Sequence, residues 1–214
     1  METTRLIARV DAEFARLDPP WWPNPHEDRE ATEEEYSRVT DPGRYRVVAL
    51  RARAWSRVLG TVPDIDVEPV APESLGPDLD GGVRLTSRRP GTLPLFFLER
   101  GPTPDSDVPL VRIGMADPDT ELELVPDCGC DACDHGSDDL VRGLDEAVVE
   151  AMSGIVLMLA GTWRGVWTPD GGGVGGDPGL PELDQVLAWG RRLSRQEHVS
   201  FPEDVRVLVN DPWM

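Results

Sequence analysis

The sequence predicts an α+β fold with N-terminal helices, an antiparallel sheet of about four to five strands, and a helix that follows a cysteine-rich turn. Apolar residues have helical spacing before residue 60, strand-like segments follow between residues 83 and 125, and a strong amphipathic pattern begins at Ser137. No internal repeat or linker is evident. We therefore expect residues 1–214 to form a single domain, with a helical part over 1–60 and an α+β part over 83–214.

The first expected helix begins after the threonines at residues 3–4 and ends at Asp18, which two prolines follow. Residues 21–28 are broken by proline and are expected to be irregular. A short helix is predicted from Thr32, because Glu35 stands at capping-box spacing from it.

The second long helix is expected to begin at Asp41-Pro42 and to end near Gly60. Three arginines lie together on the side opposite its apolar face: Arg46, Arg53 and Arg57. An arginine row of this kind binds phosphates or acidic side chains. The acidic stretch 27–35 lies just upstream, so we expect the partners of the arginines to come from it.

The remaining elements are expected to be short. Residues 60–82 contain proline and glycine without a period and are predicted to form a loop. Further elements are predicted along the chain: strands at 83–88, 93–99, 108–115 and 121–125, a helix from Ser137, a strand at 158–168, a flexible glycine-rich loop at 169–179, a short helix at 183–190 and a strand at 205–209.

The charge of the chain excludes several functions. There are 40 Asp and Glu residues against 21 basic ones, all of them arginine, which gives a formal net charge of −19. Without lysine there is no P-loop lysine and no Schiff-base lysine. This negative charge opposes binding to nucleic acid and to anionic membranes, and it is compatible with a basic protein partner.

The sequence also indicates a compartment. No stretch approaches the roughly 20 apolar residues that a membrane-spanning helix needs, and no signal peptide is evident at the N-terminus. The three cysteines are an odd number and lie within six residues, unlike a secreted disulfide framework. We therefore expect a cytoplasmic protein.

Chemistry is concentrated in one turn, Pro126 to Asp139. Cys128, Cys130 and Cys133 have C-x-C-x-x-C spacing, and His135 follows two residues later. Thiolate and imidazole are the ligands that zinc prefers, so these four residues are the predicted metal ligands. Four ligands within eight residues require a very tight wrap. The fourth ligand can therefore be remote, and His26 and His198 are the other histidines.

Five aspartates surround the cysteines, at positions 127, 131, 134, 138 and 139. Nearby carboxylates raise the pKa of a thiol, which argues against an activated nucleophile, whereas a bound cation would relieve the repulsion. A structural metal, reduced structural cysteines, and a Cys128–Cys133 disulfide or redox role all stay open at this point. No catalytic residue is assigned.

The turn resembles a family of actinobacterial proteins of unknown function. The resemblance rests on residues 35–42 (EYSRVTDP) with the helix after them, residues 114–118 (GMADP), and above all PDCGCDACD at 126–134 continuing as GSDDL at 136–140. It covers about residues 20–165. It implies a bacterial cytoplasmic protein without an assigned activity, and it implies serine at the position of His135, which makes the three cysteines the firmer ligands.

The sequence thus favours a non-enzymatic binding or regulatory protein with a metal-stabilised or purely structural cysteine turn. The alternatives are a metal- or thiol-dependent enzyme centred on the turn and flanked by Trp163 and Trp167, and an acidic protein that docks a basic partner. The enzyme alternative lacks any HExxH, GxSxG or GxGxxG motif.

Overall fold

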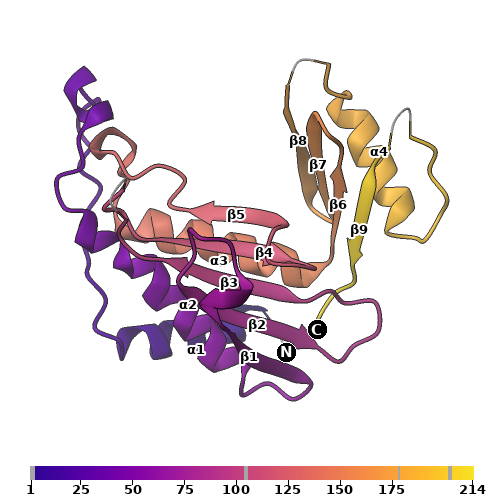
Figure 1. Ribbon diagram of the computed structural model, residues 1–214, viewed down its shortest axis with the longest axis horizontal. Helices are drawn as coiled ribbons and strands as arrows, with labels where there is room; N and C mark the ends of the chain where they lie inside the picture. Colours follow the sequence, from indigo (N-terminus) through magenta and orange to yellow (C-terminus); the bar gives the residue numbers. More distant parts are fainter. Residues whose placement is uncertain (1–2, 104–105, 178, 202–203) are drawn as a thin grey trace. The chain divides into compact units, whose positions relative to one another are not determined.

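The computed structural model describes residues 3–103, 106–177, 179–201 and 204–214. Two compact units are present: the first holds residues up to Thr86 and Pro94–Val148, and the second holds Ser87–Leu93 and Val149–Met214. Figure 1 shows the path of the chain through both. The predicted α+β class is confirmed, with helices and two antiparallel sheets. The single domain over residues 1–214 stays a prediction.

The first unit contains most of the helices and strands of the chain. They are α1 (Thr3–Ala15), η1 (Glu33–Ser37), η2 (Pro42–Tyr45), α2 (Arg46–Leu59), β1 (Ile65–Val70), η3 (Pro72–Ser74), β2 (Gly81–Ser87), β3 (Leu95–Arg100), β4 (Leu110–Met115), β5 (Glu121–Val125), η4 (Asp131–Cys133) and most of α3 (Ser137–Ser153). The strands form one sheet in the order β1-β2-β3-β4-β5, a meander in which sequence neighbours pair.

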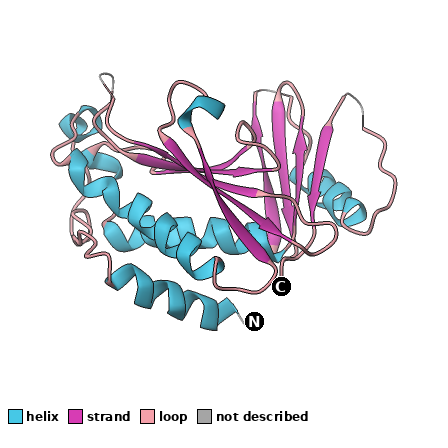
Figure 2. Ribbon diagram, turned by 60° about the horizontal axis from the view of Figure 1, so that its bottom comes forward, coloured by secondary structure: helices cyan, strands magenta, loops and turns pink. Residues whose placement is uncertain are grey.

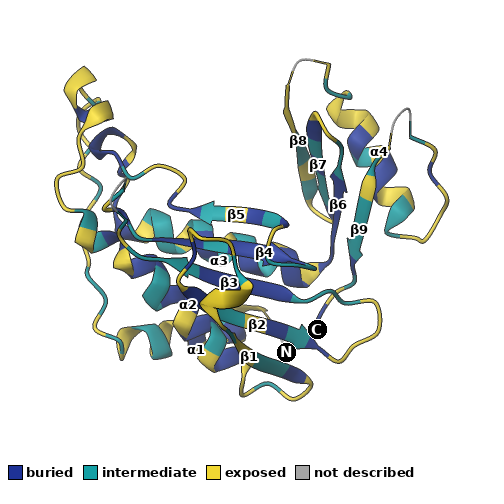
Figure 3. Ribbon diagram, viewed as in Figure 1, coloured by how far each residue is buried: buried dark blue, intermediate teal, exposed yellow. Residues whose placement is uncertain are grey.

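The sheet of the first unit is buried on both faces at its centre. Figure 2 shows the long helices gathered on one face of it, where α2 packs on β1 and β4. On the other face, Phe96 and Leu98 pack with Leu79, and the half-buried Val70 and Leu75 cover this cluster. Four consecutive residues of β3 are therefore buried, as Figure 3 shows, although a strand with one solvated face would alternate.

The second unit has its own sheet and core. It contains β6 (Ile155–Leu159), β7 (Trp163–Thr168), β8 (Gly171–Gly176), α4 (Leu183–Leu193) and β9 (Arg206–Asn210), with strand order β8-β7-β6-β9. Trp163 stacks on Trp189 of α4, with ring centroids 6.1 Å apart. A Cβ on Gly190 would lie 2.1 Å from the Cβ of Trp167, so glycine lets α4 approach β7 closely.

Three sequence predictions about elements were wrong. Residues 60–82 are not a continuous loop, because β1 lies within them, and the predicted strand 158–168 is a hairpin of β6 and β7. The glycine-rich segment 169–179 is not a flexible loop either, because its centre is strand β8, paired with β7 along its whole length. A side chain does not fit at two of its glycines: a Cβ would lie 2.1 Å from the carbonyl oxygen of Val166 at Gly172 and 2.3 Å from that of Thr162 at Gly176.

Helix α2 begins later than expected, since η2 occupies residues 42–45, and the partners predicted for its arginine row were also wrong. Arg53 pairs with Glu99, and Arg57 pairs with Glu13, rather than with the stretch 27–35. Within the described ranges, no helix is long and apolar enough to cross a membrane.

Candidate metal centre

The cysteine turn connects the end of β5 to the start of α3, both in the first unit. A cis peptide bond joins Val125 to Pro126 just before it. Gly129 lies so close to the preceding loop that a Cβ would stand 2.6 Å from the side chain of Val108. The backbone then turns through η4, so that Cys130 lies just before this short helix and Cys133 at its end.

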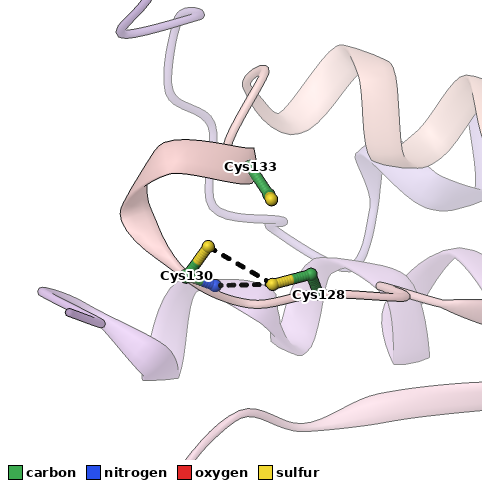
Figure 4. A group of neighbouring side chains, drawn as sticks. All are labelled: Cys128, Cys130 and Cys133. Atoms are coloured by element: carbon green, nitrogen blue, oxygen red, sulfur yellow. Dashed lines mark hydrogen bonds between the residues drawn. The ribbon is translucent and has the colours of Figure 1, made fainter. Parts of the chain in front are cut away.

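The turn brings the three sulfur atoms together. The Sγ atoms of Cys128, Cys130 and Cys133 all lie within 4.8 Å of one another, and Figure 4 shows Cys133 pointing from the end of η4 toward the other two. The Sγ atoms of Cys128 and Cys130 are 3.3 Å apart. All three cysteines are free, so the Cys128–Cys133 disulfide is not formed.

The thiols differ in their protonation. Burial raises the pKa of Cys130, but hydrogen bonds from Cys128 and Cys133 outweigh it, so that the pKa of Cys130 lies below its ordinary value. The hydrogen bond with Cys130 and burial raise the pKa of Cys133 to about 12. The exposed Cys133 thus keeps its proton, while the thiol with the lowered pKa is buried. Neither Cys130 nor Cys133 is therefore an accessible thiol of lowered pKa, the kind that acts as a nucleophile.

Asp131 fastens the turn to a distant segment of the chain. Its carboxylate accepts hydrogen bonds from Arg38 Nε at 2.6 Å, from Thr40 N–H at 2.8 Å and from the Thr40 hydroxyl at 2.5 Å. Its backbone N–H donates to the Arg38 carbonyl at 2.7 Å. The carboxylate therefore acts as the buried cross-link between η4 and residues 38–40.

Asp134 forms a second cross-link of the same kind. Its carboxylate accepts from Trp22 Nε1 at 2.8 and 3.0 Å, from the Gly136 N–H at 2.9 Å, and from Arg44. The Arg44 guanidinium also lies over the rings of Trp22 and Tyr45. The side chain of Asp134 is fully buried, and charge-assisted bonds from all sides replace the water that it loses.

These two aspartates correct one step of the sequence interpretation. Five carboxylates were expected to crowd the thiols until a cation relieved them. Asp131 and Asp134 are instead compensated by Arg38 and Arg44. They hold the turn in place, and their charges do not argue for a cation. Sequence reasoning missed both arginines, because no local pattern connects residues 38–44 to the turn.

The three histidines differ in their exposure and in the unit of the chain that holds them. His135 is exposed, and its ring centroid lies 6.4 Å from that of His26. Among the described residues, the ligand atoms within 4.8 Å of one another are those of the three cysteines, so neither His26 nor His135 belongs to this group. His26 Nε2–H donates to the Asp131 carbonyl oxygen at 2.8 Å. Its Nδ1 is inaccessible to solvent and has no hydrogen-bond partner among the described residues. His198 lies in the second unit, after α4.

The aromatic residues that the enzyme alternative placed around the turn have another role. Trp163 is part of the buried cluster of the second unit, and Trp167 packs against the same cluster. Both are accounted for by packing against α4 and its neighbours.

Comparison with known proteins gives one match. The model of a family described as a family of unknown function, DUF6226, matches residues 10–203. Searches of curated proteins and of solved structures returned no match. The family match spans nearly the whole chain, including α2, the sheet of the first unit, the cysteine turn and strands β6 to β8, and it supports the expected family of unknown function. The chain therefore belongs to the family of unknown function DUF6226.

Proposed function

We propose that this is a non-enzymatic binding or regulatory protein of the bacterial cytoplasm, in which Cys128, Cys130 and Cys133 hold a zinc ion. The observation that carries the proposal is the convergence of three sulfur atoms within 4.8 Å of one another. In a tetrahedral zinc site with Zn–S bonds of about 2.3 Å, sulfur atoms lie about 3.8 Å apart. The three thiols therefore need only small side-chain adjustments to bind the ion, whereas a histidine ligand would have to move closer to them.

The surroundings of the thiols support a structural ion. Asp131 and Asp134 fix both sides of η4 to residues 22–44, so the ligands are held by a rigid outer set of hydrogen bonds. Reducing conditions in the cytoplasm keep cysteines free to bind metal. The lowered pKa of the buried Cys130 thiol eases the loss of its proton to a metal, and the metal would displace the proton that Cys133 retains.

Two histidines compete for the fourth position. His135 was the sequence prediction. The Asp131 carbonyl accepts the proton of His26 Nε2, so in the neutral ring the free lone pair is on Nδ1. This Nδ1 is buried and has no hydrogen-bond partner among the described residues, as expected of a nitrogen that can bind a metal. Metal-bound histidines usually donate their other N–H to a carbonyl or carboxylate, as His26 does to Asp131. These features favour His26.

Elemental analysis of protein purified without chelator tests the proposal. We expect about one equivalent of zinc per chain, and less than about a tenth of an equivalent in Cys130→Ser, because that change removes the buried ligand. Asp127→Asn is the matched control, since Asp127 is an exposed carboxylate of the same turn and should leave the zinc content unchanged. Wild-type protein with less than about a tenth of an equivalent of any transition metal, and no uptake of added zinc, would contradict the proposal.

The fourth ligand is identified by zinc titration against a competing chelator. We expect His26→Gln to weaken zinc binding by at least about 10- to 100-fold, because the loss of a supporting group beside a metal already has an effect of that size. His135→Ser should change the affinity less than threefold, and His198→Gln, in the second unit, serves as the histidine control. A larger loss in His135→Ser than in His26→Gln would restore His135 as the ligand.

A further inference from the structure

A second site is indicated in the first unit, between α2 and the paired ends of β2 and β3. A cavity of about 700 Å³ lies there, within the range of small-molecule sites. Its α2 wall is one helix face, formed by residues 46, 49, 50 and 53. The opposite wall is the start of β2 and the end of β3. It shares no residue with the cysteine turn.

Both carboxylates that line this cavity are already engaged. Glu99 accepts two hydrogen bonds from Arg53, at 2.9 and 2.5 Å, in a side-by-side ion pair. Asp80 accepts the Gly101 N–H at 2.5 Å. Glu99 is therefore engaged by Arg53, whereas Asp80 keeps its negative charge, so the lining carries three arginines against two carboxylates.

Two guanidinium groups in the same cavity have no such compensation. Within the part of the chain that the structure describes, Arg46 and Arg100 form no ion pair, and Arg100 Nε is inaccessible to solvent without a hydrogen-bond partner. The more deeply buried arginines of the first unit are paired, as Arg44 is with Asp134 and Arg51 with Asp145. This excess of arginine over carboxylate in one cavity, within a chain of net charge −19, indicates a site for an anion.

The other residues that line the cavity are glycines and apolar side chains. Gly81, Gly82 and Gly101 leave one end of the cavity walled by bare backbone. Glycine is required at Gly82 by the sheet itself, because a Cβ there would stand 2.1 Å from the Phe97 carbonyl oxygen. Leu50 and Val83 supply apolar surface. The cavity thus combines a cationic part with an apolar part.

We propose that this cavity binds a small organic anion, whose carboxylate or phosphate group pairs with Arg46 and Arg100 and whose apolar body lies against Leu50 and Val83. Guanidinium groups bind both kinds of oxyanion through paired hydrogen bonds, so the geometry assigns the chemistry of the head group, an oxyanion. A ligand-binding site fits a regulatory protein, although the site stands independently of the metal centre.

Calorimetric titration of the full chain with phenyl phosphate and with phenylacetate tests this proposal, and the tighter of the two probes identifies the head group. We expect Arg46→Gln and Arg100→Gln each to weaken binding of that probe by about tenfold or more, the equivalent of one lost charge-assisted hydrogen bond. Ala49→Phe keeps every charge and fills the cavity, so it should abolish binding. Arg191→Gln removes an exposed arginine of the second unit and should bind like wild type.

Arg46 is exposed at the start of α2, so its replacement tests the proposal even if Arg100→Gln fails to fold. Neutral 2-phenylethanol should not bind, and removal of the metal with chelator should leave anion binding unchanged. The proposal is overturned if neither anion binds at concentrations up to about 10 mM. Unchanged affinity in Arg46→Gln and Ala49→Phe would overturn it as well. Inorganic phosphate that binds as tightly as phenyl phosphate would overturn the part of the proposal in which an apolar body contacts Leu50 and Val83.

Discussion

Replacing Asp145 with alanine is expected to lower the free energy of unfolding by about 3–5 kcal/mol, the cost of leaving a buried charge without its partner. The side chain of Arg51 is only 2% exposed, and Asp145 accepts hydrogen bonds from its Nε at 2.8 Å and from its terminal nitrogen at 2.5 Å. Asp145 also accepts from Trp55 Nε1 at 2.7 Å. One carboxylate of α3 thus satisfies two buried donors of α2.

Urea unfolding of the variants measures this effect through the transition midpoint. Asp139→Ala, on the same helix, removes an exposed carboxylate paired with Arg142 and should cost less than about 1 kcal/mol. Asp11 contacts Arg51 from α1 but is 59% exposed, so it does not replace Asp145. A double variant, Arg51→Met with Asp145→Leu, removes the unpaired charge but leaves Trp55 Nε1 without its acceptor, so it should recover only part of the loss. Equal costs for Asp145→Ala and Asp139→Ala would contradict this account.

Elements with their own side-chain pattern were predictable from the sequence. The apolar stripes of α1 and α3 and the strands β2 to β5 depend on residues within each segment, and each of these elements is found near its predicted bounds. Strand β8 could not be found this way, because five of its six residues are glycine and its pairing uses only the backbone. Edge strand β1 was missed because it contains Pro69 and lies among prolines and glycines typical of a loop.

In the candidate site, the ligands were predictable from the sequence, but the residues that support them were not. The three cysteines lie within six residues, so their spacing alone predicted that the sulfur atoms would meet. Their supports come from far along the chain: Arg38 is 93 residues from Asp131, and Trp22 is 112 residues from Asp134. Only the tertiary fold brings these residues together. A single sequence therefore shows the ligands of such a site but not the residues that hold them.

Asp131→Asn is expected to cost about 2–3 kcal/mol at pH 7, since it weakens charge-assisted bonds to Arg38 and Thr40 at a buried position. Asn keeps the size of the side chain and one acceptor oxygen but loses the charge. Asp127→Asn, an exposed change in the same turn, is the matched control and should alter the free energy of unfolding by less than about 0.5 kcal/mol. Urea unfolding of metal-free protein separates this effect from that of zinc.

The pH dependence of this cost tests whether charge is its cause. Burial raises the pKa of Asp131, but Arg38 and Thr40 outweigh it and hold the pKa at about 2, below the ordinary 3.8. Above pH 3.8 the carboxylate is ionised in both the folded and the unfolded chain, so its full contribution to stability is present. Between pH 3.8 and about 2 the unfolded chain takes up a proton that the folded chain does not, and the contribution is lost.

Asparagine cannot titrate, so the difference between wild type and Asp131→Asn should be constant from pH 7 to about pH 4.5 and should narrow as the pH falls further toward 2. Unfolding curves down to the lowest pH at which both proteins still fold measure this convergence. A difference that stays the same over the whole range would mean that shape and neutral hydrogen bonds hold the turn. In that case the Asp131–Arg38 ion pair would not be what fastens the cysteine ligands to the rest of the first unit.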